Sequence, residues 1–339
     1  MSYFHIWNKS CNFVRIFCLN QLKMKKTIIL AAFAAFCLNT MAQHSEPIKF
    51  GDFEHWAVRY IKESKMMGGN TRIIYAIAPT DTIRENKAFE YGKDGNPWSV
   101  SNAYAKVWGQ EKASGTVRPE KRGNGTCCRM DVILDEVSVM GGKTNVLVSG
   151  TIFTGRTIEP IKSTDDPYQN IDYGMLYTKR PAALMFDYKA LVSQENTMTQ
   201  AVALSKKKEL QGRDVPQAIV LLQKRWEDKD GNILALRVGT AFEKIEETQE
   251  EWQNRHKTTI HYGDITKTPY YKDYMGLNQP HRAMNSKGKI VPIKEVGWAT
   301  DADLPTHAII SISSGCHEAF IGHAGNTLWV DNVEWYFDK

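Results

Sequence analysis

The sequence has few cysteines, and none has the spacing of a metal-binding pair. Six cysteines occur in 339 residues, and only Cys127, Cys128 and Cys316 follow residue 42. An odd number gives no complete disulfide framework, and no C-x-x-C pair is present that would begin a zinc site. Cys127 and Cys128 are adjacent, so in a strand they point to opposite faces. One of them could pair with Cys316 in an oxidising compartment, although buried free thiols are the commoner outcome.

The sequence patterns of nucleotide-binding and hydrolytic enzymes are also absent. There is no G-x-G-x-x-G, no phosphate-binding loop and no alternation of strands and helices that would indicate a parallel sheet. There is no G-x-S-x-G motif. No second histidine lies four residues after His317-Glu318, which excludes the zinc-protease motif. His307, His317 and His323 could converge on a metal, but surface histidines without a metal are more common.

The excess of basic residues is confined to the beginning of the chain. The formal net charge is +5. The first 42 residues contain no acid and five basic residues, Lys9, Arg15, Lys23, Lys25 and Lys26. The remainder carries 38 basic and 38 acidic residues and is neutral. Nothing in it would attract a polyanion, so nucleic acid is not an expected partner.

Residues 24–42 have the three parts of a secretory signal peptide. Met24-Lys25-Lys26 is basic, an apolar run extends from Thr27 to Leu38, and small residues precede a cleavage point after Ala42. The apolar run is shorter than the ~20 residues that span a bilayer, so no transmembrane helix is expected in the mature chain. We expect export to the periplasm, the outer surface or the medium. Residues 1–23 precede a better start and resemble an upstream mis-start.

The mature chain, residues 43–339, contains many short β-type runs. Turn residues recur about every ten positions, which is typical of an antiparallel sandwich or barrel. The runs are Arg72–Ala78, Cys127–Leu134, Thr144–Phe153, Ile171–Thr178, Ala183–Tyr188, Ala218–Leu222, Ile233–Val238, Thr258–Tyr262, His307–Ser314 and Thr327–Phe337. The sequence therefore predicts an all-β domain.

Three segments fit this pattern less well. Ser193–Pro216 contains either a short helix or a solvated insertion. Thr240–Trp252 is acid-rich and amphipathic and is interpreted as a short helix. Pro269–Lys289 contains proline, glycine and asparagine and is interpreted as a long surface loop. The expected fold is therefore a sandwich with long loops and one or two short helices.

The last predicted strand contains a shift in its alternation. Leu328 and Val330 share one face, but Val333, Trp335 and Phe337 continue one residue out of phase. One extra residue in a strand exchanges its faces, so the pattern predicts a β-bulge at Asp331-Asn332. An aspartate at a bulge could direct its carboxylate at a metal or a ligand. The alternative is an ordinary core strand that closes the sandwich.

Aromatic residues in polar surroundings are the best sequence signal for a ligand. They are Trp98, Trp108, Tyr104, Tyr168, Tyr270, Tyr271 and Tyr274. An aromatic ring can stack on the apolar face of a sugar, although core packing is the more common role for any single ring. Glycoside hydrolysis needs a pair of carboxylates, and no pair can be selected from 38 acids.

Seven short motifs, taken in order, resemble one protein family. They are Gly51–Trp56 (G-F-E-x-W), Trp98–Asn102 (W-x-T-x-N), Gly150–Gly155 (A-G-x-L-F-T-G), Tyr173–Pro181 (F-G-x-P-F-x-x-R-P), Phe186–Lys189 (G-Y-Y-K), Leu304–Ser314 (P-x-x-I-x-I-x-x-S-S) and Gly325–Asn332 (G-S-x-L-x-V-D-D). Their order and spacing resemble the putative carbohydrate metabolism domain (PCMD) of secreted proteins from glycan-foraging Gram-negative bacteria, from about residue 50 to 337. The chain departs from the family pattern at Asp52, which is inserted, at Val100, where threonine is usual, and at Asn332, which replaces the second aspartate and weakens an acidic metal site.

The resemblance implies a β-sandwich related to jelly-roll carbohydrate-binding modules. Such modules often hold a structural Ca²⁺ between their first and last strands, and the oxygen donors here would be Asp52, Glu54 and Asp331. The alternative is that Glu54 is hydrogen-bonded at a strand end. No other cofactor is expected. The residues expected in or beside a sugar-binding surface are Trp98, Asn102, Tyr104, Tyr173 and Tyr188.

These observations together favour a carbohydrate-binding or accessory protein of glycan utilisation, with a poly- or oligosaccharide as its partner. One alternative is a glycoside hydrolase whose carboxylate pair is not identified. Another is a structural partner of other cell-surface glycan-utilisation proteins.

Overall fold

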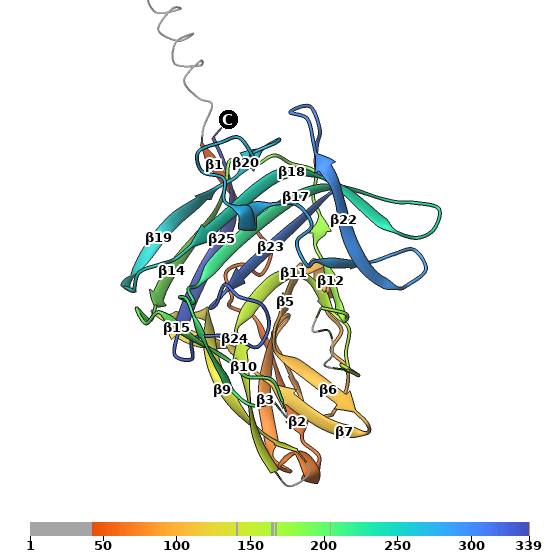
Figure 1. The fold of residues 1–339 in the computed structure, drawn as a ribbon, viewed down its shortest axis with the longest axis vertical. Helices are drawn as coiled ribbons and strands as arrows, with labels where there is room; N and C mark the ends of the chain where they lie inside the picture. The colour runs from red at the N-terminus through yellow and green to blue at the C-terminus, as the bar shows by residue number, and fades with distance from the viewer. Residues whose placement is uncertain (1–42, 140–141, 164–165, 167, 204, 339) are drawn as a thin grey trace, which may run out of the picture. The chain divides into compact units, whose positions relative to one another are not determined.

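The computed structural model describes residues 43–139, 142–163, 166, 168–203 and 205–338. The expected upstream segment and signal peptide, residues 1–42, lie outside the described residues. Residues 45–337 form one compact unit, which is built from strands (Figure 1). Its described helices are three 3₁₀ turns of three residues each, η1 (Lys65–Met67), η2 (Lys93–Gly95) and η3 (Asp273–Met275). No helix in the described part of the chain is long and apolar enough to cross a membrane.

The first large sheet has seven strands and contains the last strand of the chain near its middle. Its order is β10 (Gly142–Ser149), β9 (Gly125–Val139), β25 (Thr327–Phe337), β14 (Ala183–Leu191) and β19 (Gln249–Thr259), while β8 (Val117–Arg122) pairs with β9 and β1 (His44–Pro47) pairs with β25. Successive strands along this order are antiparallel.

The second large sheet has ten strands. Its order is β12 (Ile171–Tyr173), β11 (Thr151–Thr157), β23 (His307–Ser313), β17 (Gln217–Glu227), β18 (Ile233–Lys244), β22 (Ile290–Trp298) and β21 (Arg282–Met284), with β5 (Trp98–Val100) on β11, β13 (Met175–Leu176) on β23 and β20 (His261–Tyr262) on β18. The pair β18–β22 is parallel.

Smaller sheets complete the unit. They are β3 (Thr71–Ile77) with β2 (Trp56–Lys62) and β4 (Asp81–Ile83); β6 (Ala103–Val107) with β7 (Gln110–Ser114); and β16 (Lys208–Gln211) with β15 (Thr197–Gln200) and β24 (Ile321–Gly322). In Figure 1 the hairpins β2–β3 and β6–β7 lie together below the ten-stranded sheet.

The main hydrophobic core lies between the two large sheets. Alternation along β17 directs Val220 and Leu222 into this core, where they meet side chains such as Phe186 from β14. The intervening residues Ile219 and Leu221 belong to a second apolar cluster on the other face of the ten-stranded sheet. Because both faces of β17 are covered, its sequence is a continuous apolar run rather than an alternating one. The predicted all-β sandwich is confirmed.

The predicted β-bulge in the last strand is also confirmed. The pairing of β14 with β25 goes from Met185–Glu334 to Asp187–Asp331, so β25 has one extra residue at this point. Asn332 adopts a left-handed conformation with φ of 50°, as expected for a residue inserted at a bulge.

Of the three difficult segments, the helix predicted for one is wrong, and the other two contain short strands among their described residues. Thr240–Trp252 is not a helix: it contains the end of β18, a short connection and the start of β19. Its acids lie on and beside an edge strand, where charge prevents pairing with another chain. Ser193–Pro216 contains the β15–β16 hairpin. Pro269–Lys289 carries η3 and β21, and its Met275 and Ala283 are buried rather than on the surface.

The three cysteines after residue 42 are free. Cys128 is fully buried in the main core, while the thiol of Cys127 lies on the other face of β9 and contacts the carbonyl oxygen of Glu120. The expected opposite orientation of these two neighbours is confirmed.

Candidate functional site

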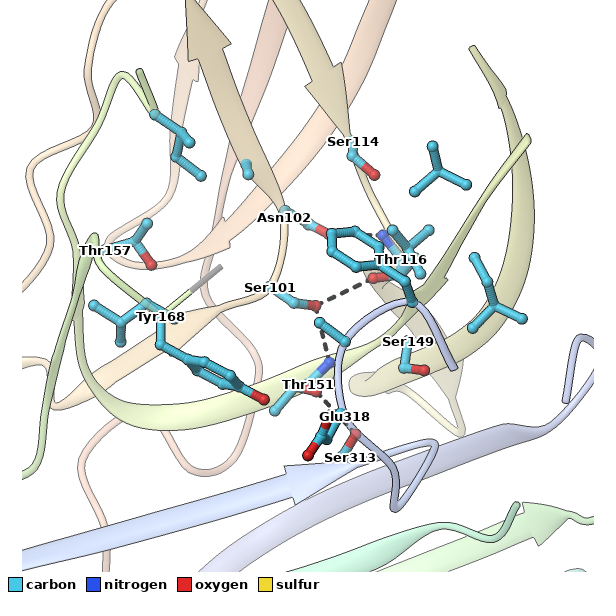
Figure 2. Close-up of a pocket in the computed structure, with 18 of the residues that line it drawn as sticks. Ser101, Asn102, Ser114, Thr116, Ser149, Thr151, Thr157, Tyr168, Ser313 and Glu318 are labelled. Atoms are coloured by element: carbon cyan, nitrogen blue, oxygen red, sulfur yellow. Dashed lines mark hydrogen bonds between the residues drawn. The ribbon is translucent and has the colours of Figure 1, made fainter. Parts of the chain in front are cut away.

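A cavity of about 860 Å³ lies on the outer face of the ten-stranded sheet. Its wall combines segments that are distant in the sequence: the sheet itself, the β6–β7 hairpin, β10, the connection around Tyr168 and the loop after β23. Figure 2 shows side chains from these segments turned towards a common space.

Hydroxyl groups form much of the polar wall of this cavity. They belong to Ser101, Ser114, Thr116, Ser149, Thr151, Thr157 and Ser313 (Figure 2). The Ser101 and Thr116 hydroxyls are 3.1 Å apart, and those of Thr151 and Ser313 are 2.9 Å apart. Each hydroxyl both donates and accepts, so this wall can exchange hydrogen bonds with a polyhydroxylated ligand.

Aromatic rings lie on the same wall. Trp108 is 89% exposed and Tyr274 is 43% exposed, and both line the cavity with the half-buried Tyr168. Trp108 and Gly109 form the two-residue turn between β6 and β7, and their φ angles are 48° and 75°. Two positive φ angles are the signature of the tight turn that joins twisted hairpin strands. The turn therefore holds the Trp108 ring out in solvent at the cavity.

Two acids lie among the described residues of the lining, and their surroundings differ. Asp135 forms an ion pair with Arg72 at 2.7 Å and its side chain is 10% exposed. Glu318 is exposed. Burial raises the pKa of the Tyr168 hydroxyl, and the negative charge of nearby Glu318 raises it further. Figure 2 shows these two side chains close together.

Trp98, which was expected in or beside a sugar-binding surface, is buried. Strand β5 pairs with β11, and this places Trp98 fully inside the main core, where it packs edge-on against Phe53 with 5.9 Å between ring centroids. Its indole Nε1 donates to the Lys49 carbonyl at 3.1 Å. No face of the ring is left for a sugar in this structure.

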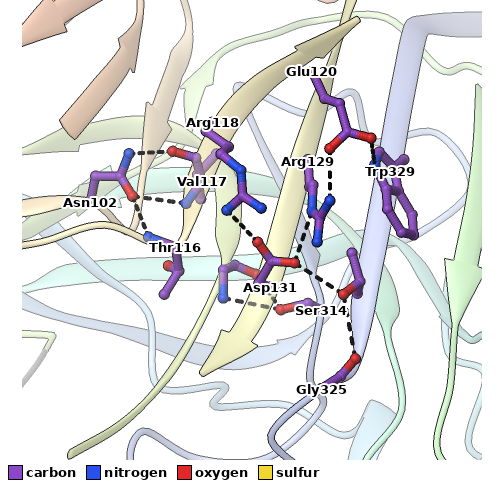
Figure 3. A network of polar contacts seen from close by, with 12 residues as sticks. Asn102, Thr116, Val117, Arg118, Glu120, Arg129, Asp131, Ser314, Gly325 and Trp329 are labelled. Carbon is purple, nitrogen blue, oxygen red and sulfur yellow. Dashed lines mark hydrogen bonds and ion pairs between the residues drawn. The ribbon is translucent and has the colours of Figure 1, made fainter. Parts of the chain in front are cut away.

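Asn102 lies at the cavity, but its amide is occupied. Its Nδ2 donates to the carbonyls of Tyr75 and Val117, at 2.8 and 2.6 Å. Its Oδ1 accepts from the amides of Thr116 and Val117, at 2.8 and 2.9 Å. A carboxamide has two donors and two acceptor positions, so the four backbone contacts use all of them; Figure 3 shows the three with Thr116 and Val117. Asn102 is a clamp between strands.

The three predicted tyrosines are dispersed. Tyr104 is buried and donates to Glu111 at 2.8 Å, and burial and this carboxylate raise its pKa to about 12. Tyr173 lines the cavity and packs edge-on against His281 with 4.6 Å between ring centroids. Tyr188 lies in the seven-stranded sheet, half-buried beside His256. The structure thus brings Asn102 and Tyr173 to the cavity and leaves Trp98, Tyr104 and Tyr188 away from it.

The acids expected to hold Ca²⁺ have protein partners. Both carboxylate oxygens of Glu54 accept from the amide of Thr126, at 3.0 and 3.2 Å, which is the hydrogen-bonded alternative. Asp331 contacts Arg122, and Asp52 is exposed. In the described part of the chain the ligand atoms of these three acids do not gather within 4.8 Å of one another. The calcium site stays a prediction.

Asp331 and its neighbour across the sheet, Asp187, form a close pair of carboxylates that the sequence could not select. Arg122 Nη1 donates to both, at 2.8 Å to Asp187 and 2.7 Å to Asp331. One carboxylate oxygen of Asp187 and one of Asp331 contact the same nitrogen of Arg122. These two oxygens are therefore no farther apart than the ~5–5.5 Å that separates the carboxyl groups of retaining glycosidases. Burial raises the pKa of Asp331 to about 6, although Arg122 opposes this shift.

Further ion pairs lie on the seven-stranded sheet, around Asp131 and Glu120. Asp131 accepts from Arg118 at 2.6 Å and from Arg129 at 3.0 Å, and Glu120 accepts from Arg129 at 2.7 Å and from the Trp329 indole at 2.7 Å (Figure 3). This network fixes β8, β9 and β25 to one another.

Comparison with known proteins gives a family but no close relative. No curated protein matches the chain. A structure described as a putative glycoside hydrolase from Bacteroides thetaiotaomicron is 15% identical and aligns over 83% of this chain and 71% of its own, with a TM-score of 0.42. A second structure with this description, from Bacteroides vulgatus, is 14% identical and aligns over 88% and 96%, with a TM-score of 0.38. The sequence profile of the putative carbohydrate metabolism domain matches residues 52–336, so the chain belongs to that family.

Proposed function

We propose that this protein binds a poly- or oligosaccharide in the cavity on the ten-stranded sheet, as an exported binding or accessory protein of carbohydrate metabolism. The observation that carries the proposal is a hydroxyl-lined cavity with a largely exposed tryptophan, Trp108, at its wall. The family supports the carbohydrate class of the ligand.

The chemistry of the cavity suits a neutral glycan. Its volume is within the ~300–1,000 Å³ typical of ligand sites. Trp108 and Tyr274 offer ring faces for the C–H side of a sugar, while Ser149 and Thr151 offer hydroxyls for its O–H groups. Of the two acids in the described lining, Asp135 is neutralised by Arg72, which leaves Glu318 without the second carboxylate that hydrolysis requires. Binding is therefore favoured over catalysis in this cavity.

Glycoside hydrolysis is a second candidate function, and it would take place on the other large sheet. Asp187 and Asp331 are close enough for a retaining pair, and the pKa of Asp331, raised to about 6 by burial, would suit a general acid. Both side chains are less than a tenth exposed and share the Arg122 counter-ion. This arrangement supports a structural ion cluster at least as well, so hydrolysis ranks second.

One experiment separates the two functions. The expected mature chain, residues 43–339, is incubated with a panel of plant, host and microbial polysaccharides, and retention and released oligosaccharide are recorded in the same tubes. We expect retention without release, and Trp108→Ala should lower retention about tenfold or more. Trp226→Ala is the matched control, because Trp226 is 42% exposed and does not line the cavity.

Each possible result has a defined meaning. If Trp108→Ala and Trp226→Ala retain glycan equally with wild type, the cavity is not the binding site. Release that is lost in both Asp187→Asn and Asp331→Asn would establish the hydrolase instead. If the chain neither retains nor cleaves any of the glycans, the result would favour a structural partner in a surface complex.

A further inference from the structure

We propose that Asp214, Cys316 and His317 form a binding site for a divalent transition metal of the Zn²⁺ type at the wall of the cavity. A carboxylate oxygen, the thiol sulfur and a ring nitrogen of these residues all lie within 4.8 Å of one another. Ligands on one zinc ion, at ~2.0–2.3 Å from it, are within about 4.5 Å of each other. Small side-chain rotations would therefore bring all three onto one ion. The proposal does not depend on glycan binding.

The sheet topology brings these residues together. Strands β17 and β23 are antiparallel neighbours, and Gln217 at the start of β17 pairs with Ser313 at the end of β23. Asp214 shortly precedes the first of these positions, and Cys316-His317 shortly follows the second. His307 lies at the other end of β23 and contacts Thr306, so it is not part of the cluster. The sequence therefore contains the cluster in two halves about a hundred residues apart.

Asp214 is held in place by the backbone. Its Oδ1 accepts from the amide of Cys316 and its Oδ2 from the amide of His323, both at 2.9 Å. A Cβ atom at Gly315 or Gly322 would lie 2.9 or 2.8 Å from Asp214 Oδ2, so only glycine leaves room for the carboxylate at both places. Asp214 is 1% exposed. Each of its carboxylate oxygens keeps a lone pair in addition to the one that accepts from a backbone amide.

His317 is oriented as a metal ligand would be. Its Nε2 lies 2.9 Å from the carbonyl oxygen of Arg213. A carbonyl oxygen only accepts, so Nε2 carries the proton, and in the neutral ring Nδ1 carries the lone pair. Metal-bound histidines commonly donate their other N–H to a carbonyl in this way. The ring is exposed, which provides a path for the ion to enter.

Cys316 differs from the other two described cysteines. It is half-buried and, with His317, lines the cavity, whereas Cys127 and Cys128 are buried in β9. A sulfur, nitrogen and oxygen donor set suits Zn²⁺ rather than Ca²⁺ or Mg²⁺, which prefer oxygen alone. Three protein ligands leave a fourth tetrahedral position, and the cavity offers space for water or a ligand oxygen there.

The test uses Zn²⁺ alone with the reduced, chelator-washed chain. Calorimetric titration should give one high-affinity site per chain, and Cys316→Ser and His317→Ala should each weaken it about tenfold or more. Cys127→Ser is the matched control and should leave the affinity unchanged. Zn²⁺ should also slow alkylation of Cys316 by iodoacetamide, followed by peptide mass spectrometry, with no effect at Cys127.

The proposal is overturned if Cys316→Ser binds Zn²⁺ as wild type does, or if saturating Zn²⁺ leaves the alkylation rate of Cys316 unchanged. Thermal unfolding of each variant in chelator shows whether it folds. His317 is exposed, so His317→Ala should fold even if Cys316→Ser does not, and the alkylation experiment needs no variant.

Discussion

Trp98 and Trp108 are ten residues apart and have opposite environments. Trp98 is fully buried between the large sheets, while Trp108 is 89% exposed. Trp98→Ala should lower the free energy of unfolding by about 3–5 kcal/mol, because truncating a core tryptophan leaves a cavity. Trp108→Ala should change it by no more than about 0.5 kcal/mol. Urea unfolding of both variants measures these values, and similar losses in the two would contradict the assigned environments.

Asn102 is the second residue whose role follows from its contacts. Asn102→Ala removes four hydrogen bonds to backbone groups of Tyr75, Thr116 and Val117, and Thr116 and Val117 are buried. Each buried group left without a partner costs about 1–3 kcal/mol, so we expect a loss of several kcal/mol in urea unfolding. Ser114→Ala, at a neighbouring position of the cavity wall, should cost much less. An equally small loss in Asn102→Ala would show that its amide is not a clamp.

At the residue scale the sequence indicated which residue types matter but not where they lie. Trp98 and Trp108 both have polar neighbours in sequence, and only the pairing of β5 with β11 buries the first. For Trp108 a local signal existed, because the following Gly109 permits the tight turn that exposes it. No local signal exists for Asp187, which meets Asp331 from a different strand.

The β-bulge in β25 gives a prediction at the scale of one element. Asn332 has a φ of 50°, which a β-branched side chain adopts only at a cost of about 1–3 kcal/mol. Asn332→Val should therefore destabilise the protein by at least that amount. Asn332→Gly is the matched control: it also loses the contact of Nδ2 with Asp187 but relieves the backbone. Thermal or urea unfolding in which both variants are equally destabilised would contradict the assigned backbone strain.

Strands could be predicted from the sequence where the spacing of the apolar residues and the positions of the turn residues indicate the same boundaries. The bulge was visible in the sequence as a change in the phase of the apolar alternation, because the core-facing residues after Asn332 are displaced by one position. The segment Thr240–Trp252 was misread because an edge strand such as β19 needs charges on positions that an inner strand would fill with apolar residues. Such a strand has no apolar alternation to reveal it.

At the scale of the whole molecule, two histidines make stability depend on pH. Burial, and then the charges of Arg237 and Arg225, lower the pKa of His281 to about 3, and burial lowers that of His307 to about 4. In the unfolded chain both titrate near their ordinary value of 6.5. Below that pH the unfolded state binds more protons, so the stabilisation present above pH 6.5 is lost as the pH falls towards the folded pKa.

His281→Phe should remove one of these contributions while keeping a ring against Tyr173. As the pH is lowered from 6 to 4, the free energy of unfolding of wild type should decline relative to the variant by about 1.4 kcal/mol per pH unit. Urea unfolding at pH 7, 6, 5 and 4 provides the comparison. Parallel pH curves for the two proteins would show that the pKa of His281 is the same in the folded and unfolded states.

The cavity belongs to the whole molecule, which is why the sequence did not predict it. Its wall takes residues from the β6–β7 hairpin, from β10, from around Tyr168 and from the loop after β23. The sequence predicted strands at β10 and β23 but not the β6–β7 hairpin, and the meeting of these segments depends on which strands become neighbours across two large sheets. Strand order is a property of long-range pairing, and a single sequence carries little trace of it.

The central position of β25 has a consequence for biosynthesis. β9 and β14 each pair with β25, which lies between them, and β25 ends at Phe337. A nascent chain emerging from the ribosome would carry both flanking strands long before the strand that joins them. The seven-stranded sheet can therefore assemble only after β25 has been synthesised, so its folding is dominated by long-range closure.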